Sequence, residues 1–258
     1  MSALPPYLAP AGDALNKGDA LAVVARGLGG TVHLAADVIK RALETREDAQ
    51  PIIVLNAQQR EGALREELWR CGVDVDKVMA RHRAAETSRN ERRALYATGG
   101  VVLCGARAAC VDLLDGTLDA SNIKGILVLD AERCAESSPE AFVVRLFRDR
   151  STQGFVRAVS EAPERLGGGF AKLAKVVKTL SVSSVALWPR FENGIADLLE
   201  KSPPSITEVS TTLDEGASLL QRRVVASIAA CARELKGRCA GLRGADVSLS
   251  VSYTHLTL

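Results

Sequence analysis

The sequence predicts a doubly wound α/β fold, in which helices cover both faces of a parallel sheet. Short apolar runs rich in Val, Ile and Leu recur along the chain and alternate with longer stretches of helical periodicity. The runs are apolar throughout, which is typical of parallel strands buried on both faces. Right-handed crossovers between such strands place helices on both sides of the sheet. At 258 residues, the chain can form one large domain, or one domain with an additional fragment.

Six apolar runs are too short for buried helices and have strand composition. They cover residues 20–25, 51–55, 101–104, 125–129, 155–159 and 184–187. The stretches between and after them repeat apolar residues at helical spacing. They predict helices over residues 32–43, 61–71, 106–114, 139–150, 170–180 and 192–200.

The pattern changes after Lys201. Residues 202–205 predict a break, residues 206–213 have the composition of a short strand, and residues 215–236 predict one long helix. We therefore expect a main domain over residues 1–213 and the start of a helical segment over residues 214–249. Residues 250–258 end without a cap or closing element, and we interpret them as a non-native tail.

Composition excludes several classes of protein. The formal net charge is only +2, so any affinity for nucleic acid must come from local basic patches. The six cysteines form no CxxC pair and only three histidines accompany them, which removes the usual zinc spacings. We interpret the cysteines as reduced, buried structural thiols of a cytosolic or nuclear protein. Residues 1–10 fit neither a secretory signal nor an anchor, and no apolar run is long enough to span a membrane.

The first predicted strand leads into Arg26-Gly27-Leu28-Gly29-Gly30-Thr31, the place where an α/β nucleotide-binding protein keeps its phosphate loop. Aligning GxxxxGK[ST] here puts Val24 at the first glycine, Gly30 at the lysine and Thr31 at the metal-binding hydroxyl. The lysine that neutralises the β and γ phosphates is missing. The dinucleotide pattern GxGxxG fails as well, because Val32 stands at its third glycine. A structural tight turn is favoured over a working ATP site, although the helix start could still hold an anion weakly.

The strand predicted at residues 125–129 leads into Leu129-Asp130-Ala131-Glu132-Arg133, the place of a DEAH-type box. In one register, Leu129 replaces the metal-binding Asp and Glu132 replaces the His. Shifting by one residue restores an Asp at Asp130 but puts Ala131 at the catalytic Glu. Two altered motifs together argue against ATPase activity. The predicted degenerate nucleotide site consists of Arg26, Gly27, Gly29, Gly30, Thr31, Asp130 and Glu132.

Six segments, in order, resemble the N-terminal half of the XPF endonuclease family of nucleotide excision repair. They are Ala25-Arg26-Gly27-Leu28-Gly29, Val54-Leu55-Asn56, Thr98-Gly99-Gly100-Val101-Val102, Gly125-Ile126-Leu127-Val128, the EAFVVRLFR string at 140–148 and the LWPRF string at 187–191. The resemblance covers roughly residues 21–249, and residues 4–20 match poorly. It implies a RecA-like, degenerate superfamily-two helicase lobe followed by a helical insert.

The resemblance also implies an activity that this chain does not itself contain. Family members incise branched DNA at single-strand/double-strand junctions through a later nuclease domain with a GDx(n)ERKxxxD motif, which is absent here. That domain is expected to use magnesium or manganese, whereas no cofactor is expected in this chain. The implied partners are branched or junction DNA, a small obligate subunit bound through the missing C-terminal domain and a repair scaffold protein. The implied location is the nucleus.

Basic side chains are the candidates for DNA contact, through phosphates and with strong salt dependence. The candidates are Arg81, Arg83, Arg107, Arg145, Arg148, Lys172, Lys175, Lys178 and Arg190. The three lysines form one stripe of an amphipathic helix and equally suit a solvated outer face. Arg81 and Arg83 form a cluster with Arg89, Arg92 and Arg93 around a predicted loop and helix start. DNA contact and plain surface charge are both open for this cluster.

Other candidates have structural alternatives. Arg145, Arg148 and Arg190 also suit support within the fold, by pairing with carboxylates or stacking on rings. Trp188 and Phe191 are expected to pack in the core. Three functions stay open at this point: an ATP-independent DNA-binding and scaffolding lobe, a DNA-dependent ATPase or translocase, and a protein-interaction platform.

Overall fold

The structure is a computed structural model, and it describes residues 4–45, 50–81, 87–151, 153–168, 171–201, 205, 207–209 and 211–238. The chain divides into two compact units, residues 1–203 and 204–258. The tail at 250–258, Cys239 and the DNA-contact candidate Arg83 lie outside the described residues, as does the side chain of Arg81. The proposed domain boundaries stay a prediction.

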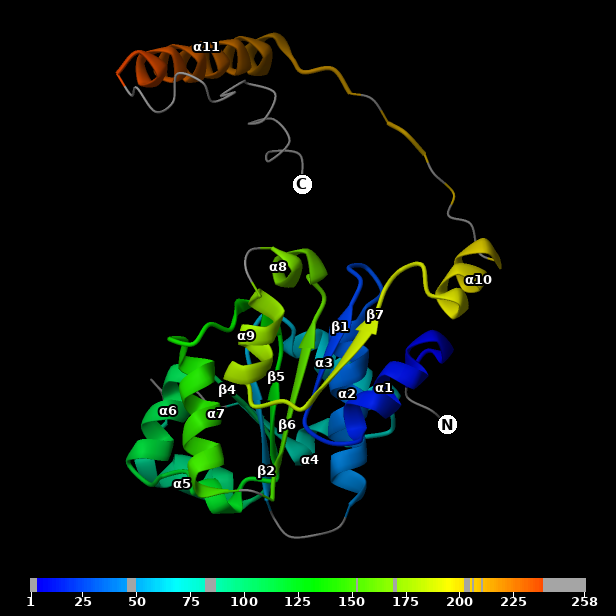
Figure 1. The fold of residues 1–258 in the computed structure, drawn as a ribbon, viewed down its shortest axis with the longest axis vertical. Coiled ribbons are helices and arrows are strands. Elements are labelled where there is room, and N and C mark those ends of the chain that lie inside the picture. Colours follow the sequence, from blue (N-terminus) through cyan, green and yellow to red (C-terminus); the bar gives the residue numbers. More distant parts are fainter. Residues whose placement is uncertain are drawn as a thin grey trace. The chain divides into compact units, whose positions relative to one another are not determined.

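The first unit is built on one seven-stranded sheet whose paired strands all run parallel, in the order β3-β4-β2-β5-β6-β1-β7 (Figure 1). Its strands are β1 (Ala20–Val24), β2 (Pro51–Leu55), β3 (Met79–Arg81), β4 (Gly100–Cys104), β5 (Gly125–Val128), β6 (Phe155–Ser160) and β7 (Ser184–Trp188). All residues of β1, β2 and β5 are buried, as their continuous apolar sequences predicted. The doubly wound α/β prediction is therefore confirmed.

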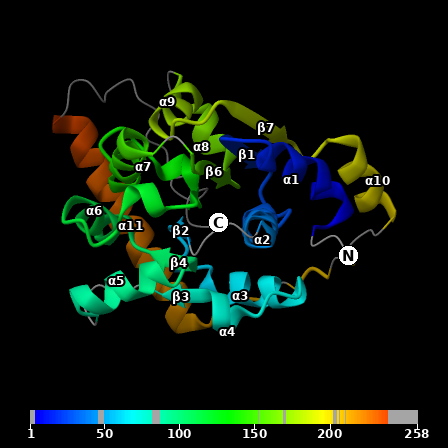
Figure 2. The same ribbon diagram turned by 90° about the horizontal axis from the view of Figure 1, so that it is seen from below.

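Helices cover both faces of this sheet (Figure 2). Each face has its own core of buried side chains. One core includes residues of α1 (Ala9–Asn16), α2 (Gly30–Glu44) and α3 (Glu61–Arg70). The other includes residues of α5 (Arg89–Ala97), α6 (Ala106–Leu114), α7 (Pro139–Arg150), α8 (Pro163–Gly167) and α9 (Lys172–Thr179). The remaining helices of the first unit are α4 (Val75–Val78), α10 (Asn193–Lys201) and the 3-10 turns η1 (Pro6–Leu8), η2 (Ala120–Asn122) and η3 (Ala131–Arg133).

The second unit contains α11 (Glu215–Arg238), which begins where the sequence predicted it. Asp214 caps the helix, because its Oδ1 accepts a hydrogen bond of 2.6 Å from the backbone N–H of Ala217. Among the described residues of this unit, large apolar side chains such as Leu220 and Val224 are exposed. No helix in the described part of the chain is long and apolar enough to cross a membrane.

Some elements differ from the sequence-based prediction. The strand predicted at residues 206–213 is wrong for the described positions 207–209 and 211–213, which belong to no strand or helix. A strand needs a neighbour for its backbone hydrogen bonds, and Val209 and Leu213 are instead exposed. The sequence also missed α1, α4, α8 and β3, whereas the helix start expected in the arginine cluster corresponds to α5. The helix predicted at 170–180 forms over the shorter range of α9.

Candidate functional site

The loop after β1 is a tight turn built on glycines. Gly27 and Gly29 have φ angles of 87° and 67°, a left-handed conformation that residues with a Cβ adopt only at a cost. Gly29 is the N-cap of α2, and the helix begins at Gly30. The loop is therefore a tight glycine turn leading into a helix, which is the interpretation that the sequence favoured.

The side chains of this loop do not suit a nucleotide. A Cβ placed on Gly30, where the lysine of a phosphate loop would stand, would lie 2.8–2.9 Å from three side-chain atoms of Val24. Val24 is fully buried and stands where the loop needs its first glycine. Thr31 is also fully buried, and its hydroxyl has no hydrogen-bond partner among the described residues. The loop therefore has no room for the lysine, and the hydroxyl that would bind metal is enclosed in the fold.

The end of β5 provides the second half of the predicted site. Leu129 is 1% exposed and belongs to the core. Asp130 follows with a left-handed backbone (φ 51°), and its Oδ1 accepts a hydrogen bond of 2.8 Å from Nη2 of Arg60. The carboxylate of Glu132 accepts a bond of 2.7 Å from Ser160 Oγ, at the end of β6. Both predicted acidic residues are thus engaged by other side chains.

A cavity of about 260 Å³ lies at these strand ends. It is lined by Arg26, Arg60, Asp130, Glu132, Arg133, Glu161, Ala162 and Arg165. In the part of the chain that the structure describes, no three His, Cys, Asp or Glu side chains converge to hold a metal ion. With the lysine position blocked and Asp130 bound to Arg60, these residues do not fit a metal–nucleotide complex. A larger hollow of about 700 Å³ lies beside Trp69, on α3 and α4, away from these strand ends.

The sequence prediction brought together the two acidic residues and the glycine loop but missed Arg60, Ser160 and Glu161. The carboxyl ends of neighbouring parallel strands share one edge of the sheet, where ligands bind in such folds. Arg60 follows β2, and Ser160 and Glu161 stand at the end of β6, so that rule points to all three once the strands are placed. The order of the strands, which the sequence did not supply, was the missing signal.

The lysine stripe has the predicted geometry. Lys175 and Lys178 on α9 are exposed and Lys172 is half-buried, whereas Val176 and Leu180 on the opposite side are buried. The structure therefore presents Lys175 and Lys178 to solvent, which both a DNA contact and a solvated helix face require.

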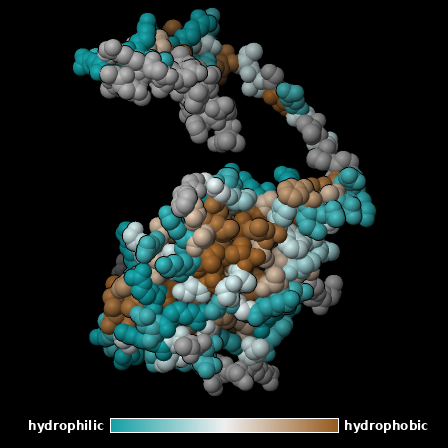
Figure 3. Space-filling model, viewed as in Figure 1, coloured by the Kyte–Doolittle hydropathy of each residue, from teal (hydrophilic) through white to brown (hydrophobic). Residues whose placement is uncertain are grey.

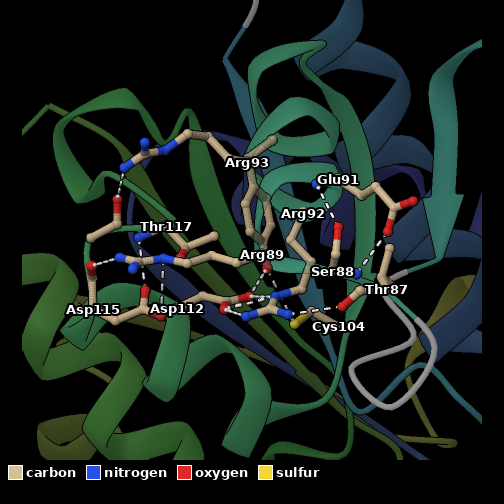
Figure 4. A network of polar contacts seen from close by, with 12 residues as sticks. Thr87, Ser88, Arg89, Glu91, Arg92, Arg93, Cys104, Asp112, Asp115 and Thr117 are labelled. Carbon is tan, nitrogen blue, oxygen red and sulfur yellow. Dashed lines mark hydrogen bonds and ion pairs between the residues drawn. The ribbon is translucent and has the colours of Figure 1, made fainter.

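The sequence left DNA contact and plain surface charge open for Arg89, Arg92 and Arg93. The structure shows a different arrangement for these arginines of α5. Arg92 forms two ion-pair contacts of 3.0 Å with the buried carboxylate of Asp112 on α6, and Tyr96 Oη donates to the same carboxylate at 2.8 Å. Burial raises the pKa of Tyr96, so its hydroxyl keeps the proton that it donates. Arg89 and Arg93 donate to residues 115–117 at the end of α6 (Figure 4). These arginines hold α5 on α6.

The remaining arginine candidates separate by exposure. Arg107, Arg145 and Arg190 are exposed on the surface. Arg148 is bound within the fold: its Nη2 lies 2.6 Å from Asp19 Oδ2, and its Nη1 donates to the backbone carbonyl of Gly154, also at 2.6 Å. Arg148 therefore supports the fold, which was the alternative to DNA contact.

The two aromatic residues of the LWPRF string differ. Trp188 packs against the core, and its Nε1 donates to the backbone carbonyl of Tyr7 at 2.7 Å. Phe191 is 83% exposed, so the prediction that it packs in the core is wrong. It follows the edge strand β7, and no described element covers it.

Of the five described cysteines, two are buried as predicted. Cys104 and Cys134 are buried, and burial raises the pKa of each thiol to about 12. Cys71 and Cys110 are half-buried, and burial raises their pKa as well. Cys231 on α11 is exposed, which corrects the prediction for that residue. The four thiols of the first unit are therefore protonated and poorly reactive near neutral pH.

The all-parallel sheet, the glycine loop between β1 and α2 and the acidic segment after β5 together fit a RecA-like fold. Similarity of structure agrees. The helicase domain of Hef from Pyrococcus furiosus matches 74% of this chain, and 39% of its own chain is covered, with a TM-score of 0.63 and 18% sequence identity.

Similarity of sequence identifies the family, although no protein-family model matches the chain. The DNA repair endonuclease XPF of Mus musculus is 32% identical over 233 residues, which cover 90% of this chain and 24% of the mouse protein. The DNA repair protein RAD1 of Saccharomyces cerevisiae is 31% identical over 84% of this chain and 22% of its own length. The chain belongs to the XPF type of DNA repair endonuclease and corresponds to the N-terminal region of these proteins. It spans about a quarter of the length of these curated relatives.

Proposed function

We propose that this chain is an ATP-independent DNA-binding and scaffolding lobe, a pseudo-helicase, of a structure-specific repair endonuclease. The observation that carries the proposal is the altered nucleotide site, in which Val24 blocks the lysine position and Arg60 binds Asp130. A lobe without nucleotide chemistry still offers a rigid sheet and exposed basic side chains. This chain is therefore expected to use no cofactor and to lack nuclease activity by itself.

The activity of the whole protein is part of this proposal. By analogy with relatives that are named as DNA repair endonucleases, the complete protein would incise branched DNA at single-strand/double-strand junctions during nucleotide excision repair, in the nucleus. The nuclease domain, lying outside this chain, would use magnesium or manganese, and the small obligate partner subunit would bind through the C-terminal domain of the complete protein.

The exposed lysines of α9 are the proposed contact to DNA phosphates. Binding of fluorescent forked DNA, measured by anisotropy between 50 and 300 mM salt, should weaken steeply as salt rises. Replacing Lys175 and Lys178 by Ala should reduce the slope of log affinity against log salt by about 2, because each lost phosphate contact removes about 0.9. The matched control replaces Lys17 and Lys77, which are exposed outside α9, and should leave the slope unchanged.

Two results would contradict this function. If both double variants had the same slope, the lysines of α9 would not be the contact to DNA phosphates. Phosphate release from ATP that increases with DNA would show a working ATPase instead, and addition of ATP with magnesium should otherwise leave DNA affinity unchanged.

A second candidate, a protein-interaction platform for a repair scaffold, is supported by the exposed apolar residues Leu220, Val224 and Ile228 of α11. These side chains recur at a spacing of four residues along one helix. Replacing Leu220 and Val224 by Glu should abolish capture of the scaffold and leave DNA affinity unchanged. Unaltered capture would contradict this second function.

A further inference from the structure

Arg60 joins the ends of three neighbouring strands. It follows β2, and its guanidinium lies 2.8 Å from Oδ1 of Asp130, after β5, and 3.7 Å from Oε2 of Glu161, after β6. These strands are adjacent in the sheet, in the order β2-β5-β6. One side chain therefore links the ends of β2, β5 and β6, at the edge of the sheet where a RecA-like domain would hold its metal and nucleotide.

The carboxylates at this edge need a positive charge. The side chain of Asp130 is 9% exposed and that of Glu161 is 16% exposed. Oε1 of Glu161 is buried and has no hydrogen-bond partner among the described residues. Buried carboxylates at such close quarters destabilise a fold unless a cation pairs with them.

Arg60 is the arginine best placed to supply that charge. Arg133 lies 3.9 Å from Asp130 Oδ2 and its side chain is 56% exposed. Arg26, with a side chain 68% exposed, pairs with Glu164 at 3.6 Å. Arg60 has the shorter contact and is only 33% exposed.

We propose that Arg60 takes the place of a divalent cation at this edge, so that β2, β5 and β6 are held together permanently without metal or nucleotide. A guanidinium supplies a fixed positive charge and several hydrogen-bond donors, whereas a metal ion binds and dissociates with its nucleotide. Loss of the lysine and gain of this internal cation together remove the need for a ligand. The proposal concerns how the edge is stabilised and does not depend on DNA binding.

The proposal predicts a latent cation site that appears when Arg60 is removed. Magnesium and manganese bind proteins through as few as one or two carboxylates with waters. In EDTA, Arg60→Ala should lower the thermal unfolding midpoint on the order of 5 °C. Millimolar manganese should restore part of that loss in Arg60→Ala and leave the original chain unchanged. Arg60→Lys, which keeps a positive charge, should lose less than Arg60→Ala and show no response to manganese.

Removing the carboxylate charges separates this role from ordinary packing. The triple variant Arg60→Ala, Asp130→Asn, Glu161→Gln should regain most of the lost midpoint in EDTA and should no longer respond to manganese. The matched control is Arg65→Ala on α3, because Arg65 also contacts two carboxylates, those of Glu61 and the exposed Asp76, away from the strand ends. Its midpoint should change little in either buffer.

Two outcomes would overturn the proposal. One is a midpoint for Arg60→Ala that matches the Arg65→Ala control. The other is a destabilised Arg60→Ala that manganese does not stabilise, or that removal of the two carboxylate charges does not restore, since Arg60 would then not stand in for a cation.

Discussion

At the scale of single residues, the altered phosphate loop contains two substitutions that depend on each other. Gly30 has no space for a Cβ because the side chain of Val24 fills it. Gly30→Ala should therefore cost about 1–3 kcal/mol through overpacking. Val24→Ala should cost about 2 kcal/mol through lost burial and the cavity it leaves.

The double variant tests this dependence. Because Val24→Ala opens the space that a Cβ on Gly30 needs, the double variant should cost less than the two single variants together, by about 1 kcal/mol. Chemical denaturation of the four proteins measures the difference. Additivity within about 0.5 kcal/mol would show that the two residues do not compete for the same space.

Asp112 is the residue on which the contact between α5 and α6 depends. Its carboxylate is 2% exposed and accepts from Arg92 and Tyr96. Asp112→Ala should destabilise the chain by about 3–5 kcal/mol, because a buried ion pair loses one partner. Asp115, near the end of the same network in Figure 4, pairs with the exposed Arg89, so Asp115→Ala should cost clearly less. Equal losses in thermal unfolding would contradict this ranking.

The sequence correctly predicted those features of the site that lie within one continuous segment after a strand. The missing lysine at Gly30 and the incomplete acidic pair at Leu129 to Glu132 follow from alignment with a motif along the chain. Arg60 was missed because its partners lie 70 and 101 positions away in the sequence, so only the strand order brings them together. Phe191 was wrongly expected in the core because an apolar residue beside a strand does not reveal that the strand lies at an edge.

At the scale of elements, β7 forms an edge of the sheet with one face open. Val185 and Leu187 are 37% and 61% exposed, whereas Leu21 and Val23 of the neighbouring β1 lie in the same register and are buried. Figure 3 shows apolar side chains gathered over this part of the sheet. Solvent therefore reaches β7 on the face where β1 is covered.

The open face predicts different costs for the same chemical change on adjacent strands. Val23→Thr places a hydroxyl in the core and should cost about 1–3 kcal/mol. Val185→Thr on β7 exposes its hydroxyl to water and should stay within about 0.5 kcal/mol. Denaturant midpoints measure both. Similar losses would mean that another part of the molecule covers β7 in solution.

The elements that the sequence predicted are those with an apolar pattern of their own. β2 and α7 formed over the predicted residues because each carries such a pattern across its full length. Only the start of α5 was predicted, and not its extent, because Tyr96 is its one buried residue and ion pairs hold the helix in place. β3 has three residues, too few to show a pattern, and becomes a strand by pairing with β4.

At the scale of the whole molecule, the fold class followed from the alternation of apolar runs with helical periodicity, because that alternation reflects burial of the whole sheet. The strand order did not follow, since pairing joins runs that are distant in sequence, such as β1 and β7. The seven strands of the described sheet and the residues of both cores nevertheless all lie within residues 1–203. This unit should fold without the residues that follow it.

A chain ending at Lys201 tests that expectation. It keeps all seven strands and α10, whose Ile195 is 1% exposed in the core, so its thermal unfolding should stay cooperative with a midpoint within about 2 °C of the full chain. A chain ending at Ser183 is the control. It lacks β7, the parallel partner of β1, and the hydrogen bond from Trp188 to Tyr7, so it should lose cooperative unfolding. If the chain ending at Lys201 also failed to fold, residues beyond 201 would be part of the structural core, and the division into two units would have to be redrawn.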